Sequence, residues 1–314
     1  MFDVACLGIL VADAIARTVD EMPERGKLMP VEQISLHTGG CAMSASIDLA
    51  KLGLKAALLG KVGKDGFGDF MVSTLKNEGV NIDGLVVKEG INTSASLVIV
   101  SSSGERTFLH CFGSNADLTY EDVNFDIIKK SKILFIGGVN LMPKFDGVPC
   151  GMVVKKAKEM GVYTALDTAW DASGRWMEIV EPSLPYLDLF IPSYDEAKMI
   201  AGKEEPEEIA DVFLSKGVKL AVIKLGKDGC FIKSKDGEKH LIPTYTDIKA
   251  VDATGAGDSF VAGFLTGLIQ GWDLYKCGRF ANAVGTHCVM EVGATTGIKK
   301  MEDILEFMRR YEDI

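Results

Sequence analysis

Several features that mark other classes of protein are missing from this 314-residue sequence. No apolar run approaches the length that spans a membrane, and the N-terminus lacks the pattern of a signal peptide. The seven cysteines form no Cys-x-x-Cys pair, and the four histidines show no metal-ligand spacing. We therefore expect a cytoplasmic protein with reduced cysteines and without a zinc site.

The sequence also lacks a basic excess. Its 34 lysines and arginines stand against 44 acidic residues, which gives a net charge of −10 and a pI near 5.0. Nucleic acid and anionic membranes attract basic surfaces, so neither is expected as a partner. The hydrophobic content of 47% is that of an ordinary globular protein, which can bury a large core.

Short apolar runs alternate with amphipathic segments along most of the chain. Strands are expected at 3–9, 55–60, 132–137, 162–166, 188–191 and 219–225, and helices at 41–52, 66–78, 146–160, 194–201, 206–216, 257–270, 273–290 and 301–312. Alternation of this kind favours right-handed crossovers. The predicted fold is α/β, with a mostly parallel central sheet and helices on both faces.

Two stretches, 14–37 and 91–112, interrupt the alternation because they lack helical periodicity. In the second stretch, strand-like runs at 95–100 and 106–112 flank a turn at 102–104. We expect the two stretches to form a small sheet beside the core. The core then comprises residues 1–13, 38–90 and 113–314.

The most informative motif is Asp252-Ala-Thr-Gly-Ala-Gly-Asp-Ser-Phe260, which leads into an apolar helical run. Around Gly255, Ala256 and Gly257, backbone N–H groups can turn toward an anion at the start of a helix. Asp258 stands where a carboxylate can take a proton from a hydroxyl group. The alternative is an ordinary glycine-rich turn in which Asp258 only complements the helix dipole.

A second motif, Thr38-Gly-Gly-Cys-Ala-Met-Ser-Ala45, opens another apolar helix that ends near Gly53. The pair Gly39 and Gly40 allows the backbone to approach a small ligand closely. A packing role at a tight turn is the alternative.

These two motifs, in this order, resemble the signatures of the ribokinase-like (PfkB) carbohydrate kinases, and most of all those of poorly characterised bacterial sugar kinases. The resemblance covers nearly the whole chain. Further matching segments are Gly8–Asp13, Gly104–Phe108, Gly113–Leu118, Pro192–Ala197 and Leu225–Gly229. It implies a β-sheet lid over the core. It also implies ATP-dependent transfer of a phosphoryl group, with Mg²⁺, to a hydroxyl of a sugar or sugar acid, with a terminal hydroxymethyl as the favoured acceptor.

The resemblance assigns Asp258 as the general base. It implies that Asp252 belongs to the surroundings of the bound anion and cation and takes no part in proton transfer. It assigns sugar binding to Asp13, at the end of the first strand, and to Gly39 and Gly40. Ser44 occupies a position where the family often has Asn, and its shorter reach leaves the hydroxyl pattern of the sugar open.

Arg106 and His110 lie on the expected lid and are candidates for substrate binding. Arg106 could pair with a carboxylate or phosphate on the substrate or on ATP. A solvated lid arginine is the alternative. Asp167–Asp171 departs from the Asp-x-Asn-x-Arg of several sugar kinases, and the nearby Arg175 is a candidate to replace the missing arginine. Because of this departure, the sequence gives only weak support for assigning fructokinase or ketodeoxygluconate-kinase specificity to this chain.

On the nucleotide side the resemblance implies Lys224, Gly226, Gly229 and, near the adenine, Asn282. It implies that Glu196 holds Mg²⁺ through water, which suits an ion that keeps several water ligands. A cap at the start of a helix is the ordinary role of such a glutamate.

The resemblance further implies a monovalent-cation site, for K⁺, at Asp252, Thr254 and Gly293. Because exposed apolar sheet faces tend to be covered, we also expect a homodimer through the lid.

Two other functions stay open. A nucleoside kinase of the same fold would need aromatic walls for a base, and Phe108, Phe112 and Trp170 are available. A catalytically silent sugar-binding protein is disfavoured because Asp258 and its glycine turn are kept. A nicotinamide-linked dehydrogenase is disfavoured because the first strand leads into Gly8–Asp13, without the Gly-x-Gly-x-x-Gly turn that binds a pyrophosphate.

Overall fold

The computed structural model describes residues 1–103 and 105–311. Gly104, in the expected lid turn, and residue 312, at the expected end of the last helix, lie outside the described residues. Among the described helices, none is both long enough and apolar enough to cross a bilayer.

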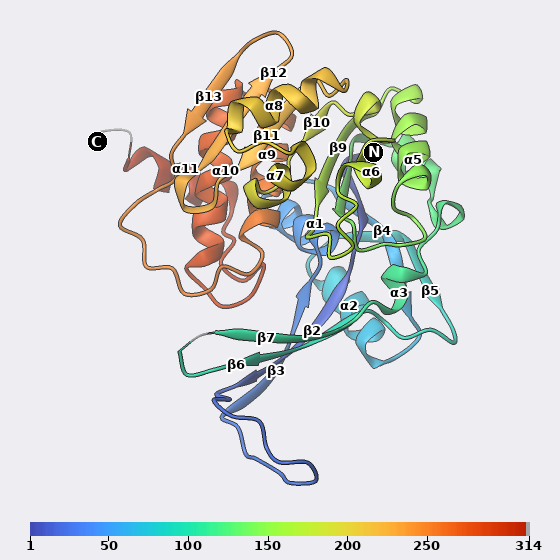
Figure 1. Ribbon diagram of the computed structural model, residues 1–314, viewed down its shortest axis with the longest axis vertical. Helices are drawn as coiled ribbons and strands as arrows, with labels where there is room; N and C mark the ends of the chain where they lie inside the picture. The colour runs from blue at the N-terminus through green and yellow to red at the C-terminus, as the bar shows by residue number, and fades with distance from the viewer. Residues whose placement is uncertain (104, 312–314) are drawn as a thin grey trace.

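A nine-stranded sheet forms the centre of the molecule, in the order β13-β12-β11-β10-β9-β8-β1-β4-β5 (Figure 1). All neighbours from β11 to β5 pair in parallel, whereas β11, β12 and β13 pair antiparallel. The strands are β1 (Phe2–Gly8), β4 (Ala56–Gly63), β5 (Asn81–Lys88), β8 (Ser131–Val139), β9 (Tyr163–Thr168), β10 (Leu189–Phe190), β11 (Leu220–Lys224), β12 (Cys230–Ser234) and β13 (Lys239–Ile242). The predicted α/β class and mostly parallel sheet are confirmed.

Helices cover both faces of this sheet because its strands are apolar on both sides. The α-helices are α1 (Cys41–Lys51), α2 (Gly66–Asn77), α3 (Gly113–Ala116), α4 (Phe125–Lys129), α5 (Val148–Glu159), α6 (Met177–Val180), α7 (Tyr194–Ala201), α8 (Pro206–Ser215), α9 (Ala256–Ile269), α10 (Leu274–Val289) and α11 (Met301–Arg309). Short 3₁₀ turns are η1 (Tyr120–Asp122), η2 (Leu184–Tyr186) and η3 (Gly226–Asp228).

The core forms two layers, one on each side of the central sheet. In β1, Val4 and Cys6 pack into the layer made by α1, α2, α9, α10 and α11, while Ala5 and Leu7 pack into the layer made by α4, α5, α7 and α8. Successive side chains of a strand point to opposite faces, which explains this division.

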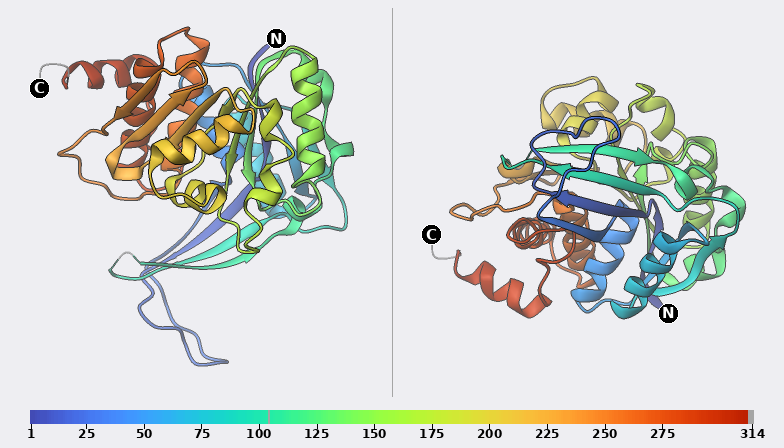
Figure 2. Two further views of the ribbon diagram at one scale, coloured as in Figure 1. Left: turned by 45° about the horizontal axis from the view of Figure 1, so that its top comes forward. Right: turned by 90° about the horizontal axis from the view of Figure 1, so that it is seen from below.

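A second, four-stranded sheet protrudes from the core as the lid, in the order β3-β2-β6-β7 (Figures 1 and 2). Its strands are β2 (Val11–Arg17), β3 (Gln33–Gly39), β6 (Ala95–Val100) and β7 (Arg106–Cys111). The small sheet predicted from the interrupted periodicity is confirmed. The boundary expected between residues 13 and 14 falls inside β2.

The placement of Asp13 at the end of the first strand is therefore wrong. β1 ends at Gly8, and Asp13 lies in the middle of the lid strand β2. Hydrophobicity could not mark this break, because the buried residues Ile9, Leu10 and Val11 continue the apolar run across it. The strands β5, β12 and β13 were not predicted, since mixed polar and apolar residues leave them without a continuous apolar signal.

Buried polar contacts attach the lid to the core. The side-chain amide of Asn115 donates to Leu10 O at 2.9 Å, and its oxygen accepts from Leu10 N at 3.1 Å. Ser94, just before β6, donates from Oγ to Phe112 O, just after β7. These contacts hold three of the four chain connections between the lid and the core, at Leu10, Ser94 and Phe112.

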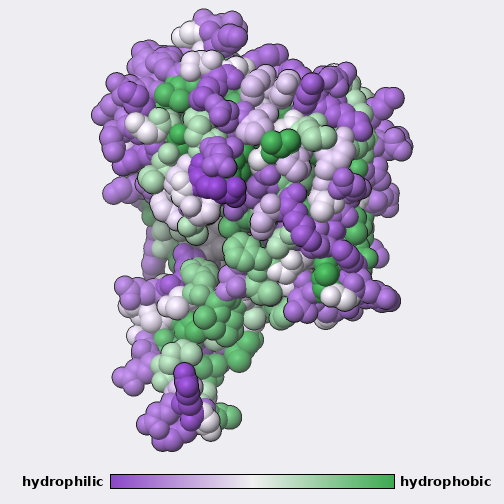
Figure 3. Space-filling model, turned by 45° about the vertical axis from the view of Figure 1, so that its right-hand side comes forward, coloured by the Kyte–Doolittle hydropathy of each residue, from purple (hydrophilic) through white to green (hydrophobic). Residues whose placement is uncertain are grey.

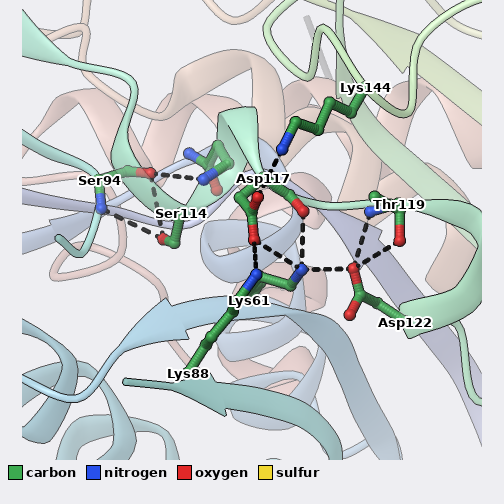
Figure 4. A network of polar contacts seen from close by, with 9 residues as sticks. Lys61, Lys88, Ser94, Ser114, Asp117, Thr119, Asp122 and Lys144 are labelled. Carbon is green, nitrogen blue, oxygen red and sulfur yellow. Dashed lines mark hydrogen bonds and ion pairs between the residues drawn. The ribbon is translucent and has the colours of Figure 1, made fainter. Parts of the chain in front are cut away.

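An ion-pair network fixes the segment that follows the lid (Figure 4). Lys61 on β4 is only 3% exposed, and its Nζ lies 2.5 Å from Asp122 Oδ2 and 3.2 Å from Asp117 Oδ2. Lys144 and Lys88 also contact Asp117. The three ammonium groups, that of Lys144 most strongly, hold the pKa of Asp117 well below its usual range.

Candidate active site

The carboxyl ends of the parallel strands meet beneath the lid, and the candidate residues gather there. Thr168 ends β9, Ser193 follows β10, and Lys224 ends β11. Open α/β sheets bind their ligands at this edge.

The turn before α1 joins the lid to the core. Gly40 caps α1 with φ of 91°, and a β-carbon there would lie 2.6 Å from Ile9 O, so only glycine fits. A β-carbon at Gly39 would lie 2.3 Å from Asp13 Oδ2. The Asp13 carboxylate therefore lies directly against the Gly39–Gly40 backbone, as the resemblance implies.

One row of polar side chains crosses the lid face that carries Asp13. Strand pairing places His37, Asp13, Ser96 and His110 side by side. Ser96 Oγ lies 3.1 Å from His110 Nδ1. Burial raises the pKa of Asp13 to about 6, and burial lowers the pKa of both histidines, so the imidazoles are neutral at pH 7.

The start of α9 carries the free donors of the site. Gly255 caps the helix in the left-handed conformation with φ of 78°, and a β-carbon there would lie 2.5 Å from the backbone of Ala294. Ser259 N donates to Gly255 O at 2.8 Å, but the N–H groups of Gly257 and Asp258 have no acceptor among the described residues. Two adjacent unpaired N–H groups at a helix start form a site for an anion.

Asp258 stands beside these donors in the first turn of α9. The Cys41 thiol and the Ser44 hydroxyl lie near its carboxylate, and no lysine or arginine of the described residues forms an ion pair with it. Withdrawal from water raises its pKa, and the Lys224 ammonium and the Cys41 thiol lower it in part. A carboxylate with a raised pKa is better matched to proton abstraction near neutral pH.

The Lys224 side chain, expected on the nucleotide side, lies at the anion site. Its Nζ is 2.5 Å from Asp167 Oδ2 and 3.4 Å from the position of a β-carbon on Gly257. Burial lowers the pKa of Lys224, but the charges of Asp167 and Glu196 raise it further, so the net shift is upward. The ammonium therefore stays protonated and adds positive charge beside the free N–H groups.

Glu196 begins α7 in a capping box with Ser193. Its Oε2 accepts from Thr168 Oγ1 at 3.0 Å and from Ser193 N at 3.2 Å, while Oε1 has no partner among the described residues. Within residues 1–103 and 105–311, no group of three or more His, Cys, Asp or Glu is arranged to hold a metal. One free carboxylate oxygen fits Mg²⁺ held through water, because this ion needs few protein ligands.

Arg106 reaches from the lid strand β7 to the loop before α9. Its guanidinium lies 3.0 Å from Asp252 Oδ1 and also contacts the Thr254 hydroxyl. Asp252 Oδ2 accepts from Gly293 N at 3.0 Å, so the three residues expected at a monovalent-cation site do lie together. His37 lies against the neighbouring loop after α10, with Nδ1 3.2 Å from the position of a β-carbon on Gly293.

The residues expected on the nucleotide side lie around the antiparallel end of the sheet. Gly226 begins the turn η3 after β11, and the backbone of Gly229 packs against Ile242. Asn282 on α10 is only 4% exposed, and its amide donates to Ile242 O at 3.2 Å and Pro243 O at 3.1 Å. It holds the backbone that borders this side of the site.

Two other candidates lie differently from the sequence expectation. Ser44 is completely buried in α1 behind Asp258, and its hydroxyl has no hydrogen-bond partner among the described residues. Arg175 turns to solvent, where it contacts Ser173 and Glu178, so it does not replace the missing arginine.

Sequence reasoning missed Asp167, Cys41 and His37 as parts of the site. Asp167 lies in β9, next to its last residue, and pairs with Lys224, while Cys41 reaches Asp258 from the first position of α1. Alternation along β3 could have placed His37 on the face of Asp13, but no sequence signal gives the pairing register.

Comparison with known proteins agrees with this geometry. The pfkB family carbohydrate kinase model matches residues 1–301. An uncharacterized sugar kinase of Archaeoglobus fulgidus is 30% identical and aligns over 81% of this chain and 99% of its own length. A probable fructokinase-5 of Arabidopsis thaliana is 30% identical, with 86% and 88% covered.

A crystal structure of Arabidopsis thaliana ribokinase, complexed with ribose and ATP, shows the same fold. Its TM-score is 0.85 at 23% identity, and the alignment covers 98% of this chain and 99% of that one. The family model spans both the glycine turn before α1 and the anion site of α9. The chain therefore belongs to the pfkB family of carbohydrate kinases.

Proposed function

We propose that this enzyme transfers the γ-phosphoryl group of ATP to a hydroxyl group, favouring a terminal hydroxymethyl, of a neutral sugar. The observation that carries the proposal is the arrangement at the start of α9. There the Asp258 carboxylate, two free N–H groups and the Lys224 ammonium lie together. Phosphoryl transfer needs a base, an anion site and positive charge in one place.

Each group then has a defined task. Asp258 accepts the proton of the acceptor hydroxyl, and the N–H groups of Gly257 and Asp258 receive the negative charge that develops on the transferring group. When bound, ATP supplies the phosphoryl group, and Mg²⁺ neutralises its charge. Glu196 Oε1 would hold the ion through water, and the η3 turn with Gly226 and Gly229 would border the nucleotide.

The charges that face the sugar side favour a neutral substrate. Asp13 is the carboxylate of the lid row, and its histidine neighbours are uncharged at pH 7. Arg106, the lid cation that could meet an acidic group, is engaged by Asp252. A sugar acid or sugar phosphate would thus meet a carboxylate and no free cation within the described part of this row.

A nucleoside is the second candidate acceptor. The next row on the same lid face consists of Ser35, Ile15, Val98 and Phe108. Phe108 is 57% exposed and offers an aromatic surface for a base. Sugars and nucleosides are both neutral, so a screen of acceptors by ADP release separates them.

A homodimer through the lid is also part of the proposal. The opposite face of the lid carries Leu36, Ala14, Leu97 and Leu109 in one row and Ile34 in the next. Figure 3 shows apolar side chains gathered over the lid. Ile34 is 72% exposed and Leu109 59%, and a second copy would present the same apolar face.

Two further elements complete the proposal. We place the enzyme in the cytoplasm, because the seven cysteines are free thiols that suit a reducing compartment. For K⁺ we propose the place where Asp252 and Thr254, before α9, meet Gly293, after α10, at the Asp252 carboxylate.

Replacement of Asp258 tests the base. Asp258→Asn keeps the shape of the site but cannot accept the proton, so we expect kcat to fall by at least about 10²-fold while ATP binding is retained. ADP release and ATP titration by calorimetry measure the two effects. A near-normal kcat in the variant would remove Asp258 from this role.

The raised pKa of Asp13 predicts the pH dependence of sugar binding. The ionised carboxylate accepts hydrogen bonds from two hydroxyls, so kcat/KM should fall as the pH drops through about 6. In Asp13→Asn, kcat/KM should be low at every pH and should not show this fall at acidic pH. An unchanged acidic limb in the variant would assign the titration to another group.

Arg106→Ala tests the neutral substrate. Since Arg106 pairs with Asp252, its loss should lower kcat/KM by a similar factor for the best neutral and the best acidic acceptor, on the order of tenfold. Arg106→Lys keeps a cation and should lose less. A loss confined to acidic acceptors would show instead that Arg106 binds an anionic substrate.

Leu109→Asp tests the dimer. A carboxylate on the outer lid face should convert a dimer of 33.9 kDa chains into a monomer, measured by sedimentation at matched concentrations. Leu241→Asp is the control, because Leu241 is a 67% exposed leucine on β13, outside the lid. A wild-type protein that sediments as a monomer would contradict the proposal.

A further inference from the structure

A buried carboxyl group lies behind the candidate base and has no part in the chemistry described so far. Asp48 in α1 is completely buried. Its Oδ2 accepts a hydrogen bond of 2.6 Å from Ser259 Oγ on α9. Its Oδ1 has no hydrogen-bond partner among the described residues.

The surroundings of Asp48 do not suit a negative charge. No lysine or arginine of the described chain forms an ion pair with it. Lys51, one turn further along α1, donates to Thr295 O at 2.8 Å and lies 3.9 Å from Glu78. Burial raises the pKa of Asp48 most, and the Asp258 carboxylate raises it as well, whereas the Ser259 hydrogen bond and the Lys51 charge lower it. The net shift is well above the usual range. A buried, unpaired charge beside another carboxylate is costly, so Asp48 is a neutral carboxylic acid.

Ser259 connects this acid to the catalytic turn. It follows Asp258 directly, and its N–H closes the first turn of α9 on Gly255 O. On the α1 side, Cys41 contacts Asp258, and Asp48 lies two turns further on. The two helices are thus joined at two points, one at the base and one just behind it.

We propose that Asp48 is a positioning residue for Asp258, which it holds through Ser259. The link fixes the first turn of α9 against α1, the helix that begins with the Gly39–Gly40 turn. It thereby sets the distance between the sugar side and the base with its anion site. The inference rests on the proposed function, because positioning is meaningful only if Asp258 reacts. A packing role would require only that Asp48 fill space.

Three replacements separate these possibilities. Asp48→Asn keeps an acceptor for Ser259 and carries no charge, so we expect kcat within about threefold of the wild type. Asp48→Leu fills similar space without an acceptor, and Asp48→Ala leaves a gap. Both should lower kcat by about tenfold or more, because the displaced turn holds Asp258 away from the reacting hydroxyl. The KM of either substrate should change little. Retention of kcat in Asp48→Leu would reduce Asp48 to a packing residue.

Ser259→Ala tests the same link from α9 and removes only a hydroxyl, so it serves if the Asp48 variants do not fold. Its kcat should fall as in Asp48→Leu, and the double replacement of Asp48 by Leu and Ser259 by Ala should be no worse than either alone. Additive losses would overturn the link.

The pH profile tests the neutral state. If Asp48 is uncharged, the acidic limb of kcat in Asp48→Asn should coincide with that of the wild type. An ionised Asp48 would instead raise the pKa of Asp258, and the limb would move to lower pH in the variant. That shift, or a kcat of Asp48→Asn as low as that of Asp48→Leu, would contradict the conclusion that Asp48 is neutral.

Two measurements do not need turnover. The infrared band of a protonated carboxylic acid should be lost in Asp48→Asn, and hydrogen exchange of the first turn of α9 should be faster in Asp48→Leu than in Asp48→Asn. If the wild type phosphorylates no hydroxyl acceptor, the proposed function fails, and these two measurements still decide whether Asp48 is neutral and holds the turn. Unchanged exchange in Asp48→Leu would contradict the positioning role.

Discussion

The unpaired N–H groups at the start of α9 are the constraint on which the rest of the site depends. Donors without protein acceptors are costly when withdrawn from water, and they persist here because Gly255 turns the chain sharply into the helix. The Lys224 ammonium cannot satisfy them, since it is itself a donor and is held by Asp167. Two N–H groups and an ammonium beside one another leave an anion as the fitting occupant, and the adjacent carboxylate of Asp258 can accept a proton beside it.

The lid completes the site from the opposite side by charge as well as by shape. Arg106 joins β7 to the Asp252 loop, and His37 covers Gly293 in the loop after α10. The N–H of Gly293 in turn donates to Asp252. Lid position is therefore linked to the loop that leads into the anion site. The hydrogen bonds of Asn115 and Ser94 hold three of the four connections between the lid and the core, so any closing motion must bend the strands or turn about these points.

Sequence reasoning predicted the features that depend on local pattern. The parallel strands, the long helices and the glycine turns follow from apolar periodicity and from residues that tolerate unusual backbone angles. It could not find the partners of the site, because these depend on strand register and side-chain direction. Asp13 was placed on the wrong strand since the apolar run continues past Gly8, and no local pattern shows that the Lys224 ammonium reaches Asp167 and the Gly257 turn.

The same distinction explains why the role of Asp48 could not be predicted from the sequence. An aspartate one turn before the end of a helix is most often a solvated charge, and the pattern around it gives no reason to expect burial. Only the packing of α1 on α9 encloses it, and only the missing cation makes the neutral form the stable one. A neutral acid can accept from Ser259 without adding negative charge next to Asp258. An ionised one would oppose both the base and the anion that the free N–H groups of α9 receive.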